Sequence, residues 1–128
     1  MQVPVVCGTH GKVAFYNATQ ATDEHRGWAL GTFITDPDQR PITSEFEIKW
    51  CNNKTGEERT EWSQGSAGCA FTIVLKGTCE MMFAPEGKNG EVVSEILTEG
   101  MAVFWENSVP HKWRVIEDVK WICVRRLH

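Results

Sequence analysis

His111 is the first candidate for chemistry. It lies in the stretch LTEGMAVFWENSVPHKWRV, directly after Pro110, two residues before Trp113 and eleven after Gly100. An imidazole beside a cavity can bind a metal, transfer a proton, or hydrogen-bond an anion or hydroxyl. Two interpretations stay open: His111 faces a pocket, or it is a structural histidine bonded to the backbone. It is a catalytic candidate only if the protein is an enzyme.

The segment DEHRGW holds a second group of candidates, His25, Arg26 and Trp28, beside Gly27. A guanidinium and an imidazole next to a glycine, which permits close approach of the backbone, suit a phosphate or carboxylate. The alternative is an ordinary polar strand start whose arginine pairs with a surface acid.

Two further segments are predicted strands that carry charged side chains. In TGEERTEW, a predicted strand, Arg59 could clamp an oxyanion, or it could pair with the neighbouring acids at the surface. In EFEIKW, Glu47 and Lys49 alternate with apolar residues, so they face either solvent or a cavity. Inside a cavity both would have to be paired or hydrated, because an isolated buried charge is costly.

Six tryptophans are many for a chain of 128 residues. Indole rings serve a packed core and a stacking pocket equally well. We expect about half of the following group to touch a ligand and the others to be core residues: Trp50, Trp62, Trp105 and Trp113.

Length and charge limit the class of protein. The chain fits one domain, residues 1–128, with a net charge of −4, which does not favour binding to long nucleic acid but permits a small anionic ligand. It contains no apolar run long enough to cross a membrane, and its start does not resemble a signal peptide. The five cysteines form no C-x-x-C pair. We therefore expect a cytoplasmic protein without disulfides.

Glycines and prolines divide the sequence into short segments rich in β-branched and aromatic residues, such as WALGTFI, SEFEIKW, AFTIVLK, TCEMMF, MAVFW and VKWICVRR. Strands of this length between turn signals predict an antiparallel sandwich or barrel with little or no helix. AFTIVLK and VKWICVRR are apolar on nearly both faces, so both faces of these strands must be covered. A homodimer is one way to cover them.

The spacing from Gly100 to His111 resembles the second conserved segment of the small cupins, although the proline and second glycine of that pattern fall on Glu106 and Ser108. From Asp23 to Arg126 the chain is similar to short bacterial single-domain cupins that often carry a misleading signal-peptidase label. This resemblance implies an all-β fold: one cupin-type barrel, a double-stranded β-helix of two antiparallel sheets.

The first conserved segment of metal-binding cupins carries two histidines, a glutamate and a closing glycine. If the closing glycine is Gly77, the glutamate position falls on Ala70 and the histidine positions fall on Ser63 or Gln64 and on Gly65 or Ser66. In the turn after KW, where relatives often have histidine, this chain has Asn53. A lone imidazole cannot hold a transition metal at useful affinity. We expect no metal and no cofactor.

The leading hypothesis is a metal-independent protein that binds a small polar or anionic ligand, nucleotide- or sugar-like, in the mouth of the barrel. Alternatives are a cupin isomerase, epimerase or lyase in which His111 shuttles a proton with Glu47 or Glu57 as acidic partner, a metal-dependent oxygenase, and a protein that sequesters a signalling nucleotide. The predicted ligand-binding residues are His25, Arg26, Trp28, Glu47, Lys49, Arg59, Trp62, Trp105, His111 and Trp113.

Overall fold

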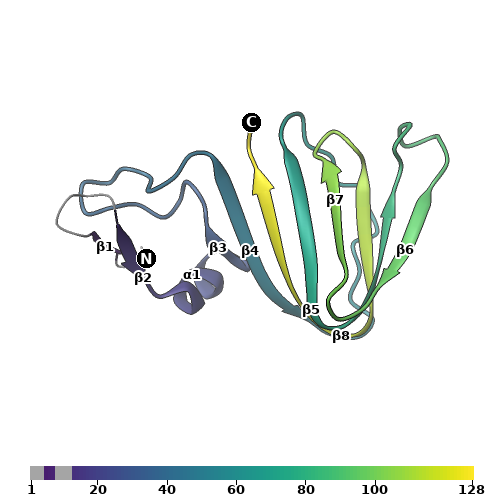
Figure 1. The fold of residues 1–128 in the computed structure, drawn as a ribbon, viewed down its shortest axis with the longest axis horizontal. Coiled ribbons are helices and arrows are strands. Elements are labelled where there is room, and N and C mark those ends of the chain that lie inside the picture. The colour runs from purple at the N-terminus through teal and green to yellow at the C-terminus, as the bar shows by residue number, and fades with distance from the viewer. Residues whose placement is uncertain (1–4, 8–12) are drawn as a thin grey trace.

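The structure, a computed structural model, describes residues 5–7 and 13–128, with side chains from residue 13 onward (Figure 1). Its elements confirm the all-β prediction, and one helix of seven residues fits the expectation of little helix. They are β1 (Val5–Cys7), β2 (Ala14–Tyr16), α1 (Ala18–Glu24), β3 (Trp28–Leu30), β4 (Phe46–Asn53), β5 (Cys69–Phe83), β6 (Val93–Leu97), β7 (Ala102–Glu106) and β8 (His111–Arg126).

The main sheet has the strand order β3-β4-β8-β5-β6, and β7 also pairs with β5. Strands β5 and β8 are 15 and 16 residues long and antiparallel. Residues 69–74 of β5 pair with residues 121–126 of β8, and residues 79–83 pair with residues 111–115. Figure 1 shows both strands bending at the base, so that their halves rise as two facing walls.

We name the walls by their outer strands. The β4 wall contains β3, β4, β7 and the half of the β5–β8 ladder with residues 69–74 and 121–126. The β6 wall contains β6 and the half with residues 79–83 and 111–115. The barrel was expected to have two antiparallel sheets, and its facing halves are indeed antiparallel, but β5 and β8 run through both of them.

The bend depends on Gly77. The register between β5 and β8 shifts around this residue, from Val74 to Cys79. Gly77 has φ +90°, and a Cβ atom there would lie 2.0 Å from the carbonyl oxygen of Asp118. Only glycine combines this left-handed conformation with so close an approach of two backbones. The glycine therefore allows one strand to turn from one wall into the other.

Apolar side chains fill the space between the walls near the bend. Inward-facing residues alternate with outward-facing ones along each strand, as the pleat requires. The buried cluster consists of Ala70, Val74, Cys79, Met81, Leu97, Trp105, Val115, Val119 and Trp121. Val74, Cys79, Val115 and Val119 of this cluster lie near the bend, whereas Ala70, Met81, Trp105 and Trp121 also line the pocket.

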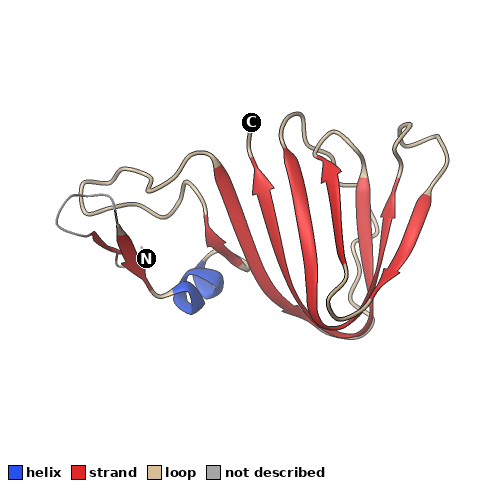
Figure 2. Ribbon diagram, in the orientation of Figure 1, coloured by secondary structure: helices blue, strands red, loops and turns tan. Residues whose placement is uncertain are grey.

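Helix α1 lies beside β3 and outside the two walls, where Figure 2 shows it in blue. The side-chain oxygen of Asn17 caps the helix by accepting a hydrogen bond of 2.9 Å from the backbone of Gln20. Ala21 of the helix packs with Ile34 in a second small core. No helix among residues 5–7 and 13–128 is long and apolar enough to cross a membrane.

Two strand predictions need correction. WALGTFI is a strand only at Trp28–Leu30. TGEERTEW forms no regular strand, although it runs along β8: the Arg59 N–H bonds to the Trp113 carbonyl, and Ser63 exchanges hydrogen bonds with His111. From Arg59 to Ser63 this segment therefore advances by four residues, while the facing part of β8, from Trp113 to His111, advances by only two. The surplus residues bulge outward and prevent a continuous ladder.

Candidate functional site

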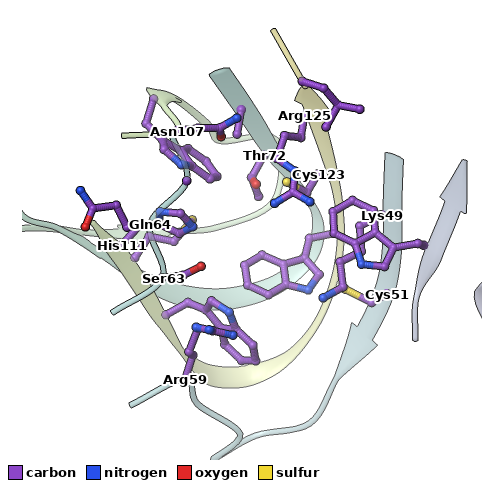
Figure 3. A pocket seen from close by; sticks show the side chains of 18 of the residues that line it. Lys49, Cys51, Arg59, Ser63, Gln64, Thr72, Asn107, His111, Cys123 and Arg125 are labelled. Carbon is purple, nitrogen blue, oxygen red and sulfur yellow. The ribbon is translucent and has the colours of Figure 1, made fainter. Parts of the chain in front are cut away.

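A pocket of about 490 Å³ opens between the two walls (Figure 3). The inward-facing residues of three adjacent strands form its floor on the β4 wall. These are alternate residues, because every second side chain of a strand points to the same face. They are Lys49, Cys51 and Asn53 of β4, Trp121, Cys123 and Arg125 of β8, and Ala70 and Thr72 of β5.

The β6 wall contributes Met81, His111 and Trp113 to the pocket. The irregular segment beside β8 supplies the rim with Arg59 and residues 63–67. Backbone hydrogen bonds hold this segment: the Ser63 N–H donates to His111 at 2.8 Å, and the Gly65 N–H donates to Asn107 at 2.7 Å. The rim is therefore part of the framework of the barrel.

The charge of the pocket differs in sign from that of the whole chain. Three cationic side chains, Lys49, Arg59 and Arg125, line the pocket, and no aspartate or glutamate is among the described residues that line it. The chain as a whole has a net charge of −4. Arg125 forms an ion pair with Glu47. Lys49 and Arg59 take part in no ion pair of the described residues.

Two of these cationic side chains lie over the ring of Trp28. The guanidinium carbon of Arg125 lies 4.9 Å from the ring centroid, and the Lys49 Nζ lies 5.5 Å from it. Strand pairing places Trp28 opposite Lys49. Cation–π attraction of this kind holds flexible cationic side chains near one position without neutralising them. The positive charge is thus fixed at one side of the pocket.

The sequence left two interpretations of His111 open, and both apply. His111 lines the pocket, and it also forms a hydrogen bond to the backbone. Its Nδ1 lies 3.0 Å from the carbonyl oxygen of Val109. A carbonyl only accepts, so Nδ1 carries the proton and Nε2 keeps its lone pair. Burial lowers the pKa of His111, and the charges of Arg59 and Arg125 lower it further, against the bond to Val109. The imidazole is therefore neutral at neutral pH.

Both acids considered as partners of His111 are engaged elsewhere. Glu47 binds Arg125 with a hydrogen bond of 2.8 Å from Nε. Glu57 accepts a hydrogen bond of 2.7 Å from the side-chain amide of Asn53. Neither lines the pocket. His111 consequently has no carboxylate partner for proton transfer among the described residues of the pocket.

Two thiols face the pocket, Cys51 and Cys123. Burial raises the pKa of both, although Lys49 acts on each in the opposite direction. Burial also raises the pKa of Cys79, in the core, to about 11. A thiol of raised pKa is a poor nucleophile at neutral pH.

No protein-family model and no curated protein matches the sequence. Solved structures do. A cupin described as RmlC-like from Desulfovibrio desulfuricans has a TM-score of 0.50 and 25% identity, covering 66% of this chain and 74% of that one. A conserved Streptococcus pyogenes protein of unknown function has a TM-score of 0.53 and 18% identity, covering 68% of each chain.

The chain has the fold of the small cupins. A Bacillus subtilis oxalate decarboxylase variant is also similar, with a TM-score of 0.58, 14% identity and 70% of this chain covered. This chain spans only 23% of the decarboxylase. Likeness at that identity concerns the fold alone.

Many cupins hold a metal, and the residues of this chain do not fit one. The sequence positions that correspond to the ligands in metal-binding cupins do lie in the pocket with His111, but they are Ser63, Gln64, Gly65, Ser66 and Ala70. No group of three or more histidine, cysteine, aspartate or glutamate side chains among the described residues is arranged to hold an ion. One imidazole and two thiols of raised pKa are a poor donor set.

Six of the ten predicted ligand-binding residues line the pocket, namely Trp28, Lys49, Arg59, Trp105, His111 and Trp113. The other four lie elsewhere. His25 packs on Phe33, with ring centroids 4.3 Å apart, and Arg26 is exposed in a left-handed turn. The Lys112 ammonium covers Trp62 at 4.5 Å, and Glu47 binds Arg125 behind the lining.

Sequence reasoning missed several lining residues of β4, β5 and β8. The sequence did contain a signal for these residues. If Lys49 faces the cavity, alternate residues of β4 face it too, and strand pairing places alternate residues of the neighbouring strands on the same face. The prediction that VKWICVRR is apolar on nearly both faces does not show which of its residues point into the pocket. The missed residues include Cys51, Thr72, Trp121, Cys123 and Arg125.

Proposed function

We propose that this cupin binds a small anionic ligand, of nucleotide or sugar-phosphate size, in the pocket between its walls and without a metal. The observation that carries the proposal is the cationic lining, with no carboxylate among the described residues of the pocket, in a chain of net charge −4. A volume of about 490 Å³ lies within the usual range for small-molecule sites.

The lining suits the parts of such a ligand. Lys49 and Arg59, which lack ion-pair partners among the described residues, would meet a phosphate or carboxylate. Trp113 and Trp121 contact each other edge to face, with centroids 5.2 Å apart, and present indole surface to a base or sugar. The buried Nε1 of Trp105 has no partner among the described groups, and a ligand oxygen would satisfy it.

Passive binding is favoured over turnover by the surroundings of His111. A general acid–base pair needs two groups whose pKa values differ and whose atoms reach the same substrate. His111 is neutral, and the two acids considered as its partners, Glu47 and Glu57, are bonded to other side chains. His111 then serves as a hydrogen-bonding group. Sequestration of a signalling nucleotide would use the same pocket.

Thermal unfolding with a panel of nucleotides, nucleotide sugars and sugar phosphates, in the presence of EDTA, tests the proposal. Neutral nucleosides and sugars are the matched controls. A ligand at about 100 times its dissociation constant stabilises the folded protein by about 2.7 kcal/mol, or several degrees in Tm. Lys49→Met and His111→Ala should reduce the shift, whereas Lys54→Met, outside the pocket, should keep it. Flat responses, or equal responses to the neutral controls, contradict the proposal.

A further inference from the structure

The outer face of the β4 wall is apolar across four strands. The residues that alternate with the pocket lining point away from it and pair in register, so they form continuous rows. One row is Ile48, Val124, Phe71 and Phe104, and the next is Trp50, Ile122, Ile73 and Ala102.

Much of this face remains exposed. Phe104 is 64% exposed and Phe71 39%. Four strands about 4.8 Å apart and some five residues long at about 3.4 Å each give roughly 300 Å² in plan. The patch is contiguous, in contrast to apolar residues scattered singly over a surface, and the largest apolar patch of a protein is often functional. The face therefore has the character of an interface core.

Charges of opposite sign lie at the upper end of the face. The row that follows Phe71 contains Arg126 of β8, Cys69 of β5 and Glu106 of β7, so Arg126 and Glu106 flank the small Cys69. Neither charge belongs to an ion pair of the described residues. A hollow of about 310 Å³ lies between them, lined in part by Phe104. Two unlike, unpaired charges thus stand on either side of β5.

We propose that a second copy of this chain packs on the outer face, with a two-fold axis running along β5. Such an axis places β8 of one copy over β7 of the other. Arg126 then meets Glu106 of the second copy, twice, and Val124 meets Phe104. The contact is isologous, as in most homodimers, and two sheets packed in this way lie within about 30° of each other.

Charge is the reason to choose a second copy over an unrelated partner. A face that carries both signs, one on each side of its central strand, is complementary to itself under this rotation. The apolar residues of β8, β5 and β7 supply the desolvated core and the charges supply the rim, the usual anatomy of an interface. Both pockets open on the inner faces and stay accessible, so the inference does not depend on the proposed function.

Charge reversal tests the geometry. The wild-type protein should sediment as a dimer that dissociates on dilution. Arg126→Glu or Glu106→Arg alone places like charges opposite each other at both contacts and should weaken dimerisation about tenfold or more. Mixing the two variants in equal amounts brings unlike charges together at both contacts and should restore a dimer. A refolding artefact would not produce recovery on mixing.

Phe104→Glu should also give a monomer, because it places a charge in the apolar row. Ile96→Glu is the matched control, since Ile96 is 50% exposed on the outside of the β6 wall. Circular dichroism of each variant checks that it is folded. A wild-type monomer at all concentrations overturns the proposal. A dimer insensitive to Phe104→Glu, or two charge variants that fail to recover on mixing, also overturns it.

Discussion

The indole Nε1 of Trp121 donates a hydrogen bond of 2.7 Å to the side-chain oxygen of Asn53. The two residues are 68 apart in the sequence and lie on neighbouring strands. The amide of Asn53 in turn donates to Glu57 on the rim segment. One asparagine therefore links the floor of the pocket to its rim. It occupies the place where related cupins often have histidine, and here its bonds are structural.

Asn53→Ala should lower the free energy of unfolding by about 1–3 kcal/mol, because it leaves the N–H of a tryptophan that is 7% exposed without a partner. Urea denaturation measures the change. Asn52→Ala, at an exposed neighbouring position, should change stability by no more than about 0.5 kcal/mol. Equal effects of the two substitutions would show that the bond to Trp121 contributes nothing.

Gly77→Ala should destabilise the barrel by about 2–5 kcal/mol, since it adds a backbone clash with Asp118 to the strain of a left-handed residue. Gly87→Ala separates the two effects. Gly87 also has a positive φ, +104°, but a Cβ there meets nothing within 4 Å, so strain alone should cost about 1–2 kcal/mol. Chemical denaturation of both variants gives the difference. Indistinguishable midpoints would mean that the bend tolerates a side chain.

Stability should decline as the pH falls below about 6.5, the ordinary pKa of histidine. The pKa of His111 is lowered in the folded protein, chiefly by burial, so in this range the unfolded chain binds a proton that the folded one does not. His111→Gln removes this contribution. The wild-type and variant Tm values, measured from about pH 7.5 to about pH 5, should diverge on acidification. Parallel curves would contradict the assignment of a neutral buried imidazole.

Alkylation of the cysteines reports on occupancy of the pocket. The compound that gives the largest thermal shift should slow the modification of Cys51 and Cys123, which line the pocket, and leave Cys69 on the outer face unchanged. Cys79, buried in the core with a pKa of about 11, should react most slowly with or without ligand. Mass spectrometry of digests follows each site. Uniform protection of all cysteines would indicate general stabilisation and no specific contact.

Hydrophobic periodicity and turn residues, which act locally, were enough to predict most of the strands and an antiparallel sandwich or barrel, and the resemblance to the cupins selected the barrel. The resemblance to the cupins, in which the Gly100–His111 spacing takes part, implied that His111 faces the pocket, and His111 does line it. TGEERTEW was wrongly predicted as a strand because its side chains alternate as those of a strand do. Its backbone forms hydrogen bonds with β8 at only some positions. The bulge between Arg59 and Ser63 depends on the length of the facing strand, which alternation does not encode.

The position of Arg125 shows a second limit. Its neighbours on β8 are apolar, and nothing in VKWICVRR distinguishes the arginine that faces Trp28 from Arg126 on the opposite side. The pairing of β4 with β8 makes that distinction, over 70 residues of chain. The sequence likewise shows that both faces of β8 are apolar, but not what covers the outer one.

Because β5 and β8 each pass through both walls, the floor of the cavity takes its shape from continuous backbone, and the loop segment adds only the rim. Substituting one inward side chain alters the lining while the hydrogen-bonded ladder behind it is untouched. Relatives that share this framework can thus diverge in what they hold by exchanging alternate residues of a few strands, with no remodelling of the scaffold.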